Sequence, residues 1–473
     1  MSADEHKFFF SSDFLLHALH EASKASGAQW KLPDHKNQEK SPLAYLRIPL
    51  YPENAPWIQV FYSNIFHLYP PSAGKTDSLP EPELSGPALS ETPVPIEKIP
   101  LSSMPCPPVP EPEDVFHAAM ERLAPHKKLM TSEKRHTASL SPIALLRQWD
   151  LDRSVEIPRY EHRLTGIQTS YGRGLSLENA RTACIMEAAE RITAFAGTTG
   201  SEISMRLHPS PIRKATFSQL KKEGMEALDP NSLLLEAPMP DQALWWMPGE
   251  KTGLLSKKPC LVPVQCVLLF SNLPEPQLFT ALGSTGLAAG SSKEGACLAG
   301  LLEVIERDAE ATMPHNPENC FQIASRDPEV SRLLQAYRDQ GVHPFFEDIT
   351  TEFGIPSYRC LIMGNKGEVV RGTGTNLSGK KALISALTET PWPFPGPPGQ
   401  KPHIKVIRSL ESLPDFSTSN PANDLNRVEN CLLANGFTPV HVELTRRDLR
   451  IPVVRSLVPG LEILGDFDRF STV

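Results

Sequence analysis

Two short segments of this sequence place carboxylates and a guanidinium at the same spacing. Each reads Glu-x-x-Glu-Arg, once at 187–191 and again at 303–307. Residues three apart share one face of a helix, so each segment presents two carboxylates side by side. Paired carboxylates suit a hard cation such as Mg²⁺, and the neighbouring arginines suit phosphate oxygens. The candidate metal ligands are Glu187, Glu190, Glu303 and Glu306.

The residues around the second segment indicate that its carboxylates are buried. Its helix carries Leu298, Leu301 and Ile305 on one side and small residues on the other. Carboxylates buried beside such a stripe are costly unless they are paired or bind a metal. Two facing helices would offer four carboxylates together with Arg191 and Arg307. That set suits Mg²⁺ bound to a triphosphate.

Two other interpretations remain open at this point. Neighbouring glutamates and arginines on ordinary helices form surface salt bridges, which would make both segments purely structural. A dinuclear iron bundle is the other metal site to consider, but it needs Glu-x-x-His, and neither segment has His there. The near-identity of the two copies favours the nucleotide and Mg²⁺ site over both alternatives.

Both segments belong to a longer internal repeat. With Glu187 placed over Glu303, the string Gly-x-Ser-x-Glu-x-Ala-x-x-Ala-x-x-x-Glu-x-x-Glu-Arg is shared, starting at Gly174 and at Gly290. A third, weaker copy covers 378–389. The copies are unequally spaced, which indicates an internally duplicated domain and not a solenoid. Glycine and serine at the start of each copy predict a loop that leads into a helix with an N-cap.

Apolar patterning around the repeats alternates between helix and strand. The longest helical patterns lie at 177–196 and 293–312, and a shorter helix is predicted at 115–123. Apolar runs rich in β-formers predict strands at 260–270, 344–349, 358–363, 440–444 and 452–458. The alternation predicts a mixed α/β (α+β) domain in which helices flank the sheets.

Proline divides the chain into parts. The sequence has 47 prolines, and about a dozen of them lie between positions 70 and 112 among Ser, Glu and small residues. Such a stretch cannot bury enough surface to fold, so we predict a linker over 70–114. It separates a small α/β module at 1–69, which shows no catalytic constellation, from the main domain at 115–473.

Composition excludes several classes of protein. The net charge is −8 with no basic stripe, which argues against a nucleic-acid binder. The sequence contains no run of about 18 apolar residues, so no membrane span is predicted. The N-terminus lacks the pattern of a secretory signal. The eight cysteines form no Cys-x-x-Cys pair, so reduced thiols and a cytoplasmic location are expected.

Glycine-rich loops precede both acidic helices, at 171–174 and 285–290. Such loops can hold phosphate through backbone N–H groups at a helix N-terminus. The sequence contains no Gly-x-x-x-x-Gly-Lys-Ser/Thr string, so a Walker-type site is excluded. A nucleotide site would therefore be built on the glutamates.

These motifs resemble the YcaO family over roughly 134–473. The resemblance rests on Gly-Arg-Gly-Leu-Ser and Glu-Ala-Ala-Glu-Arg within 172–191, and on Gly-Leu-Ala-Ala-Gly and Leu-Leu-Glu-Val-Ile-Glu-Arg-Asp within 286–308. It continues through Gly-Thr-Gly and Ala-Leu-Thr-Glu within 372–389 to Ile-Pro-Val-Val-Arg-Ser-Leu-Val-Pro-Gly-Leu-Glu at 451–462.

The resemblance implies an enzyme that binds ATP and Mg²⁺ and phosphorylates the oxygen of a peptide backbone amide. A Cys, Ser or Thr side chain then yields an azoline, and sulfide yields a thioamide. It also implies a peptide or protein substrate, a separate partner protein that presents it, and a homodimer. One branch of the family instead assists methylthiolation of a ribosomal protein, so an accessory, scaffolding role is the alternative.

Carried over residue by residue, the resemblance assigns roles to the motif positions. Glu187, Glu190, Glu303 and Glu306 would bind metal and phosphate, and it implies seven residues that contact the nucleotide or its acidic cluster. These seven are Lys134, Ser141, Arg173, Arg191, Ser291, Arg307 and Glu389.

The third motif departs from the family pattern. Ser385, Trp392 and Phe394 replace an Arg, a Gln and an Arg, and Gly295 replaces a Glu, whereas Glu389 is retained. The proline-rich C-terminal end of azoline-forming members does not appear in this sequence. These departures favour a thioamide-type or non-peptide role over azoline formation, and they are also compatible with the accessory role.

Overall fold

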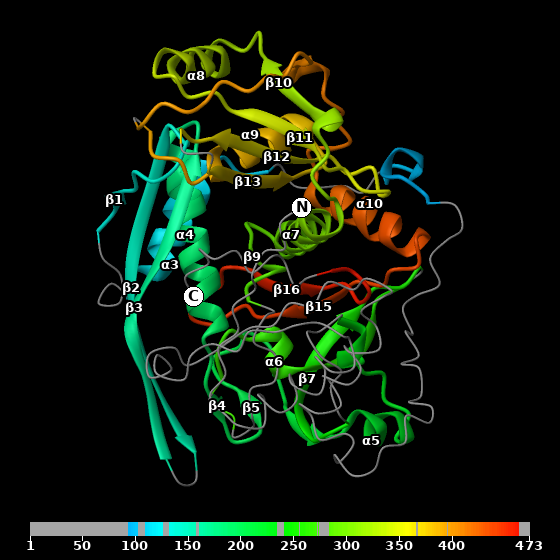
Figure 1. Cartoon of the computed structure of the whole chain (residues 1–473). Helices are drawn as coiled ribbons and strands as arrows, with labels where there is room; N and C mark the ends of the chain where they lie inside the picture. Colours follow the sequence, from blue (N-terminus) through cyan, green and yellow to red (C-terminus); the bar gives the residue numbers. More distant parts are fainter. Residues whose placement is uncertain are drawn as a thin grey trace, which may run out of the picture. The chain divides into compact units, whose positions relative to one another are not determined.

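Figure 1 shows a computed structural model of the chain. It describes residues 93–462 except 103–108, 126–131, 158–159, 234–240, 255, 272, 274–282, 366–367 and 395, and only the backbone of 151–166 and of residue 199. The predicted N-terminal module at 1–69 lies outside the described residues. Within the segment predicted as a linker, Ile96 is fully buried and donates its N–H to the carbonyl of Phe353 at 2.7 Å.

The three copies of the sequence repeat form three strand–helix units. In each unit a strand ends a few residues before a helix that starts after a serine. All three helices lie next to the same central region (Figure 1). The units are β3 (Tyr160–Gly174) with α4 (Leu177–Ala194), β9 (Leu287–Ala289) with α7 (Lys293–Thr312), and β13 (Val369–Thr375) with α9 (Gly379–Glu389).

The serines mark the start of each helix. The side chain of Ser176 accepts the N–H of Asn179 at 3.2 Å, and Ser292 accepts the N–H of Gly295 at 3.0 Å. Each bond satisfies one of the N–H groups that an α-helix leaves free in its first turn. Ser378 is the N-cap of α9 but makes no such side-chain bond, in keeping with the weaker third copy.

A long hairpin supports the first unit. The antiparallel strands β2 (Ile143–Ile157) and β3 pair along their whole length, and the short strand β1 (Lys134–Arg135) adds to the β2 edge. Helices α3 (Pro112–Leu123) and α4 pack on one face of this sheet, where Trp149, Ile185 and Ala189 form a buried core.

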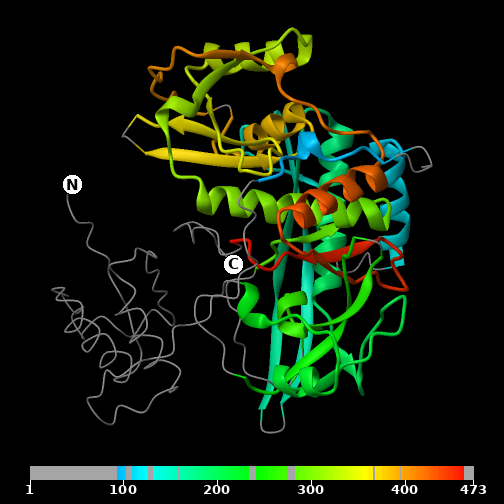
Figure 2. The same cartoon turned by 90° about the vertical axis from the view of Figure 1, so that its right-hand side faces the viewer.

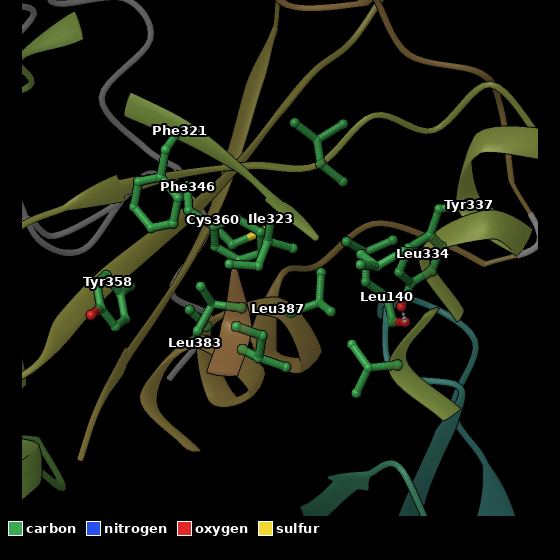
Figure 3. Packing of buried hydrophobic residues seen from close by; sticks show 14 of the residues in the cluster. Leu140, Phe321, Ile323, Leu334, Tyr337, Phe346, Tyr358, Cys360, Leu383 and Leu387 are labelled. Carbon is green, nitrogen blue, oxygen red and sulfur yellow. Dashed lines mark hydrogen bonds between the residues drawn. The ribbon is translucent and has the colours of Figure 1, made fainter. Parts of the chain in front are cut away.

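The third unit belongs to a five-stranded sheet of order β13-β12-β11-β10-β14, antiparallel except for the β10–β14 pair. Its core brings α8 and α9 together with β10, β11 and β12, through Phe321, Tyr337, Cys360 and Leu387 among others (Figure 3). The remaining elements are β10 (Cys320–Ala324), α8 (Pro328–Asp339), β11 (Phe345–Asp348), β12 (Ser357–Met363) and β14 (Ile407–Ser409).

The second unit lies in a six-stranded sheet, in which β9 pairs with β16 and β16 with β15. Helix α7 packs on β16, α10 packs on α7, and both views show α7 between the two larger sheets (Figures 1 and 2). The elements are β6 (Arg213–Ala215), β7 (Leu244–Lys251), β8 (Lys258–Pro263), α10 (Pro421–Ala434), β15 (Val440–Glu443) and β16 (Val453–Leu457).

Most of the predicted elements are confirmed, and the mixed α/β fold with them. Helix α7 has the predicted bounds, and α4 ends two residues earlier than predicted. The prediction of one strand over 260–270 is wrong, because the chain turns after β8 into the short helix α6 (Val264–Val267). The β2–β3 hairpin was not predicted from the sequence. The seven cysteines that the structure describes are buried and form no disulfide with one another.

Glycines four residues before two of the serines let strand and helix touch. A Cβ on Gly172 would lie 2.0 Å from the carbonyl oxygen of Ala180, and one on Gly374 would lie 2.3 Å from that of Ala382. Backbone atoms cannot yield as side chains do. We therefore expect Gly172→Ala to lower the free energy of unfolding by about 3 kcal/mol in urea titrations. The control Gly295→Ala, whose Cβ has no neighbour closer than 3.4 Å, should be neutral or slightly stabilising.

Candidate functional site

The three repeat helices bring their glutamates together. Glu187, Glu303 and Glu389 stand at the same place in the three units, eleven residues after the N-cap serines. Burial is the largest cause of the raised pKa values of Glu190 on α4 and Glu389 on α9, and the charge of Glu303 on α7 adds to both. The three helices therefore face one another at these positions. The structure thus places five sequence-predicted carboxylates, Glu187, Glu190, Glu303, Glu306 and Glu389, in one cluster.

Backbone N–H groups orient three of these carboxylates. Tyr171 of β3 donates to Glu187 at 2.7 Å, and Gly286 donates to Glu303 at 3.0 Å. Thr375, the last residue of β13, donates its N–H to Glu306 at 2.8 Å. Strand ends from all three units therefore fix the acidic cluster, and α7 contacts the third unit directly.

The two motif arginines lie against the carboxylates of their own helices. Arg191 Nε is 3.4 Å from Glu190 Oε1, and Arg307 Nη1 is 2.8 Å from Glu310 Oε2. Burial disfavours the charge of Arg307, but Glu310, Glu306 and Glu303 outweigh burial and raise its pKa. The side chains of Arg191 and Arg307 are 28% and 36% exposed, and each guanidinium group has more N–H groups than these ion pairs use.

The carboxylates are not fully neutralised. Burial raises the pKa of Glu190 and Glu306 well above the usual value, and neighbouring carboxylates raise it further. Burial is also the first cause of the raised pKa values of Glu187, Glu303 and Glu389. The residue Glu389 is exposed to solvent overall, yet its carboxyl group is surrounded by enough protein to be desolvated. Mutually repelling carboxylates on rigid helices fit the oxygen-ligand set that Mg²⁺ requires.

Two residues that were not among the predicted ligands join the cluster. Glu310, one turn after Glu306 on α7, pairs with Arg307 and accepts a hydrogen bond from the hydroxyl of Thr373. Arg455 is fully buried on β16 and donates to the carbonyl of Gly283 at 2.9 Å. Burial lowers the pKa of Arg455 to about 10, against the pull of Glu303 and Glu190. The sequence signal for Arg455 was a charged residue inside an apolar strand.

The other four predicted nucleotide contacts lie in different settings. Arg173 faces Glu389 and lowers its pKa against the effect of burial. Ser141 is buried, where its hydroxyl donates to the carbonyl of Ile143 and accepts the N–H of Gly174 at 3.0 Å. Lys134 and Ser291 are exposed, on β1 and just before the α7 cap. Their nucleotide contacts remain predictions.

The departures in the third motif fall mainly in the core. Trp392 is 5% exposed, within the cluster of the five-stranded sheet, and the ring of Phe394 lies edge-on to Tyr337 at 4.7 Å. Ser385 lies on α9 where the helix meets Gly374. The aromatic replacements thus contribute to packing while Glu389 keeps its place in the acidic cluster.

A second group of residues has side chains of the types that bind metals, but hydrogen bonds and ion pairs within the chain account for it. Ligand atoms of His315, Cys320 and Glu347 lie within 4.8 Å of one another. Glu347 already accepts the N–H of Asn316 at 2.6 Å and pairs with Arg359 at 2.9 Å and with His315 at 3.0 Å. Its carboxylate is therefore satisfied without a metal.

The fold and the site together define an internally repeated α/β protein in which three helices share one carboxylate-rich cluster. The profile described as "YcaO cyclodehydratase, ATP- and Mg²⁺-binding" matches residues 171–391 and 396–462. The chain belongs to the YcaO family. This confirms the resemblance seen in the sequence, and ATP and Mg²⁺ are the cofactors that the family description gives.

Two curated proteins are similar to this chain in sequence. An uncharacterized protein of Methanothermobacter thermautotrophicus is 28% identical over 330 residues, 62% of this chain and 82% of that protein. An uncharacterized protein in the tfuA 3′ region of Rhizobium leguminosarum bv. trifolii is 29% identical over 239 residues, 46% of this chain and 53% of that protein.

Solved structures share the fold. YcaO from Methanopyrus kandleri, bound with AMPPCP and Mg²⁺, superposes with a TM-score of 0.52 at 19% identity, over 75% of this chain and 92% of that chain. A heterocyclase in complex with substrate and cofactor gives 0.58 at 18% identity over 77% of this chain. This chain spans only 55% of that heterocyclase.

Among the helices of the described residues, none is long and apolar enough to cross a bilayer.

Proposed function

We propose that this protein uses ATP to activate a peptide backbone amide by phosphorylating the amide oxygen. The observation that carries the proposal is the cluster of five glutamates from three repeat helices, all with pKa values raised by burial. Such a cluster is unfavourable without a cation. It is the type of site that a family of ATP- and Mg²⁺-binding cyclodehydratases would need.

The residues of the cluster have distinct parts in this proposal. Glu190, Glu303 and Glu306 would hold Mg²⁺, because they are the most crowded carboxylates of α4 and α7. Arg307 would bind phosphate oxygens with the N–H groups that Glu310 leaves free. The backbone donors of Gly286 and Thr375 keep two ligands in one orientation, so little reorganisation is needed when the ligand binds. Bound ATP would supply the phosphoryl group that makes an amide oxygen a good leaving group.

The nucleophile defines the product. A Cys, Ser or Thr side chain of the substrate would close an azoline ring, whereas sulfide would give a thioamide. We propose the thioamide or azoline type of modification on a peptide presented by a separate partner protein, with the protein working as a cytoplasmic homodimer. The accessory alternative, a scaffold without turnover, is favoured by Ser385, Trp392 and Phe394, which replace polar positions of the third motif.

Calorimetric titration of the full-length protein tests the nucleotide site. We expect micromolar binding of AMPPCP in Mg²⁺ and a loss of most of that affinity in EDTA, because the uncompensated carboxylates repel a triphosphate. Undetectable binding to folded protein in Mg²⁺ would refute the ATP-dependent function. Mg²⁺-dependent binding of ATP without any ATP hydrolysis in the presence of partner and peptide would favour the accessory role.

A further inference from the structure

The five-stranded sheet ends in an open strand edge next to the acidic cluster. Among the described residues β13 is the terminal strand of this sheet and pairs only with β12. Figure 1 shows β13 as the strand of its sheet that lies nearest to α7. The outer edge of a terminal strand is a row of backbone N–H and C=O groups with which another strand can pair.

Two hydrogen bonds show which backbone groups of β13 point outwards. Asn376, just after the strand, donates its N–H across the sheet to the carbonyl of Pro356 at 3.1 Å. Thr375 donates its N–H in the other direction, to Glu306 on α7 at 2.8 Å. The backbone groups of successive residues point to opposite sides of a strand. The odd-numbered residues from Val369 to Thr375 therefore direct theirs away from β12.

This outer edge leads from the protein surface to the acidic cluster. Val369, at its outer end, is 57% exposed, whereas Thr373 is only 4% exposed. At the inner end, the N–H of Thr375 holds Glu306. The six steps from Val369 to Thr375 cover about 20 Å of extended strand. A chain that pairs with this edge is therefore guided from solvent to the carboxylates.

Thr373 has outward backbone groups that lack a partner. Its hydroxyl donates to Glu310, but no residue that the structure describes pairs with its outward N–H or carbonyl group. Buried backbone groups without a hydrogen bond are rare and costly. The backbone of a second extended chain would supply both partners.

The helices on both faces of β13 decide what kind of chain fits beside it. A Cβ on Gly372 would lie 2.6 Å from the carbonyl oxygen of Ala386 on α9, and Gly374 is as close to the same helix. Thr373 points to the opposite face, where it contacts Glu310 of α7. The space between the two helices suits one extended strand. The sheet edge of a second copy would bring its own helices into that space.

We propose that the outer edge of β13 binds an extended segment of the peptide substrate by strand addition and leads its backbone amides to the acidic cluster. The inference rests on the proposed function, because that reaction acts on a peptide backbone amide, and it adds the place where the substrate docks. Strand addition gains its affinity from main-chain hydrogen bonds. Binding should therefore depend on the N–H groups of the peptide.

The test uses a fluorescein-labelled probe peptide, Thr-Val-Ser-Val-Thr-Val, whose residues favour an extended strand. Its control is the same peptide methylated at every peptide nitrogen, which removes the N–H donors and keeps the side chains. Fluorescence polarisation would measure both peptides on the wild type, Arg371→Pro and Arg371→Ala. Proline removes one outward N–H at an edge position that tolerates it, whereas alanine removes only the side chain.

We expect Arg371→Pro to bind the probe roughly 10-fold more weakly than the wild type, and Arg371→Ala to bind it like the wild type. The methylated peptide should not bind. If the folded wild type does not bind the probe at all, or binds both peptides equally well, docking by strand addition is refuted. An equal loss in Arg371→Pro and Arg371→Ala also refutes it, because the side chain is then the cause. If Arg371→Pro does not fold in urea titrations, the comparison of the two peptides on the wild type decides.

Titration with Mg²⁺ and AMPPCP separates this inference from the proposed function. Arg371→Pro should bind AMPPCP like the wild type, because Arg371 lies outside the acidic cluster. A wild type that binds AMPPCP but not the probe refutes the docking edge and leaves the ATP site standing. A wild type that binds the probe but not AMPPCP refutes the ATP-dependent function and leaves the edge as a peptide-binding site.

Discussion

The double variant Glu303→Gln/Glu306→Gln should bind Mg²⁺-ATP at least about 100-fold more weakly than the wild type, about 2.8 kcal/mol. The two carboxylates lie on adjacent turns of α7, and their raised pKa values show that the protein alone does not neutralise them. Glutamine keeps the shape and can still accept the N–H groups of Gly286 and Thr375, but it removes the charge that binds Mg²⁺. Calorimetry at fixed Mg²⁺ gives the two dissociation constants.

A matched control separates loss of the site from loss of overall charge. Glu121→Gln/Glu329→Gln removes two glutamates from exposed positions on α3 and α8 and should leave the ATP affinity within a factor of two or so. The apo form of the site variant should be no less stable than the wild type, because two repelling buried charges are gone. A site variant that binds Mg²⁺-ATP with wild-type affinity would show that these glutamates are not the metal ligands.

The repeated helices could be predicted because their signals are local. Serine caps, the 3.6-residue apolar period and the Glu-x-x-Glu-Arg spacing all lie within one helix length, so the position of α7 follows from the sequence alone. The third copy keeps only part of the string. Its Glu389 nevertheless joins the acidic cluster, because the strand–helix unit, and not the full motif, places it there.

The contacts between units could not be predicted in the same way. Arg455 reaches the cluster from β16, the last strand that the structure describes, and His136 meets Tyr171 through pairing across β1, β2 and β3. Such neighbours depend on strand register, which a sequence without strong turn signals does not specify. The prediction of a strand over 260–270 was wrong because the local apolar pattern was ambiguous. Its apolar residues are buried in both β8 and α6, and a short apolar run fits either element.

The structure also ties the end of α7 to the five-stranded sheet. Arg359 of β12 and Glu347 of β11 form an ion pair at 2.9 Å, with side-chain exposures of only 6% and 1%. The second amino group of Arg359 approaches the carbonyls of Glu310 and Met313 at 3.4 Å. The sheet therefore helps to hold the helix end that carries Glu306, Arg307 and Glu310, although this ion pair lies outside the acidic cluster.

Arg359→Met should lower the free energy of unfolding by about 3–5 kcal/mol at pH 7, because it leaves the buried carboxylate of Glu347 without its main cation. Urea titrations of the variant and the wild type at pH 7 measure this loss.

The double variant Glu347→Gln/Arg359→Met identifies the origin of that loss. It removes both charges and leaves no ion uncompensated, so we expect it to be clearly more stable than Arg359→Met alone at pH 7. Glutamine can still accept the N–H of Asn316. If the double variant is as unstable as the single one, the penalty comes from the lost contacts of Arg359 with the carbonyls of Glu310 and Met313, and the ion pair then contributes through α7 and not through the charge of Glu347.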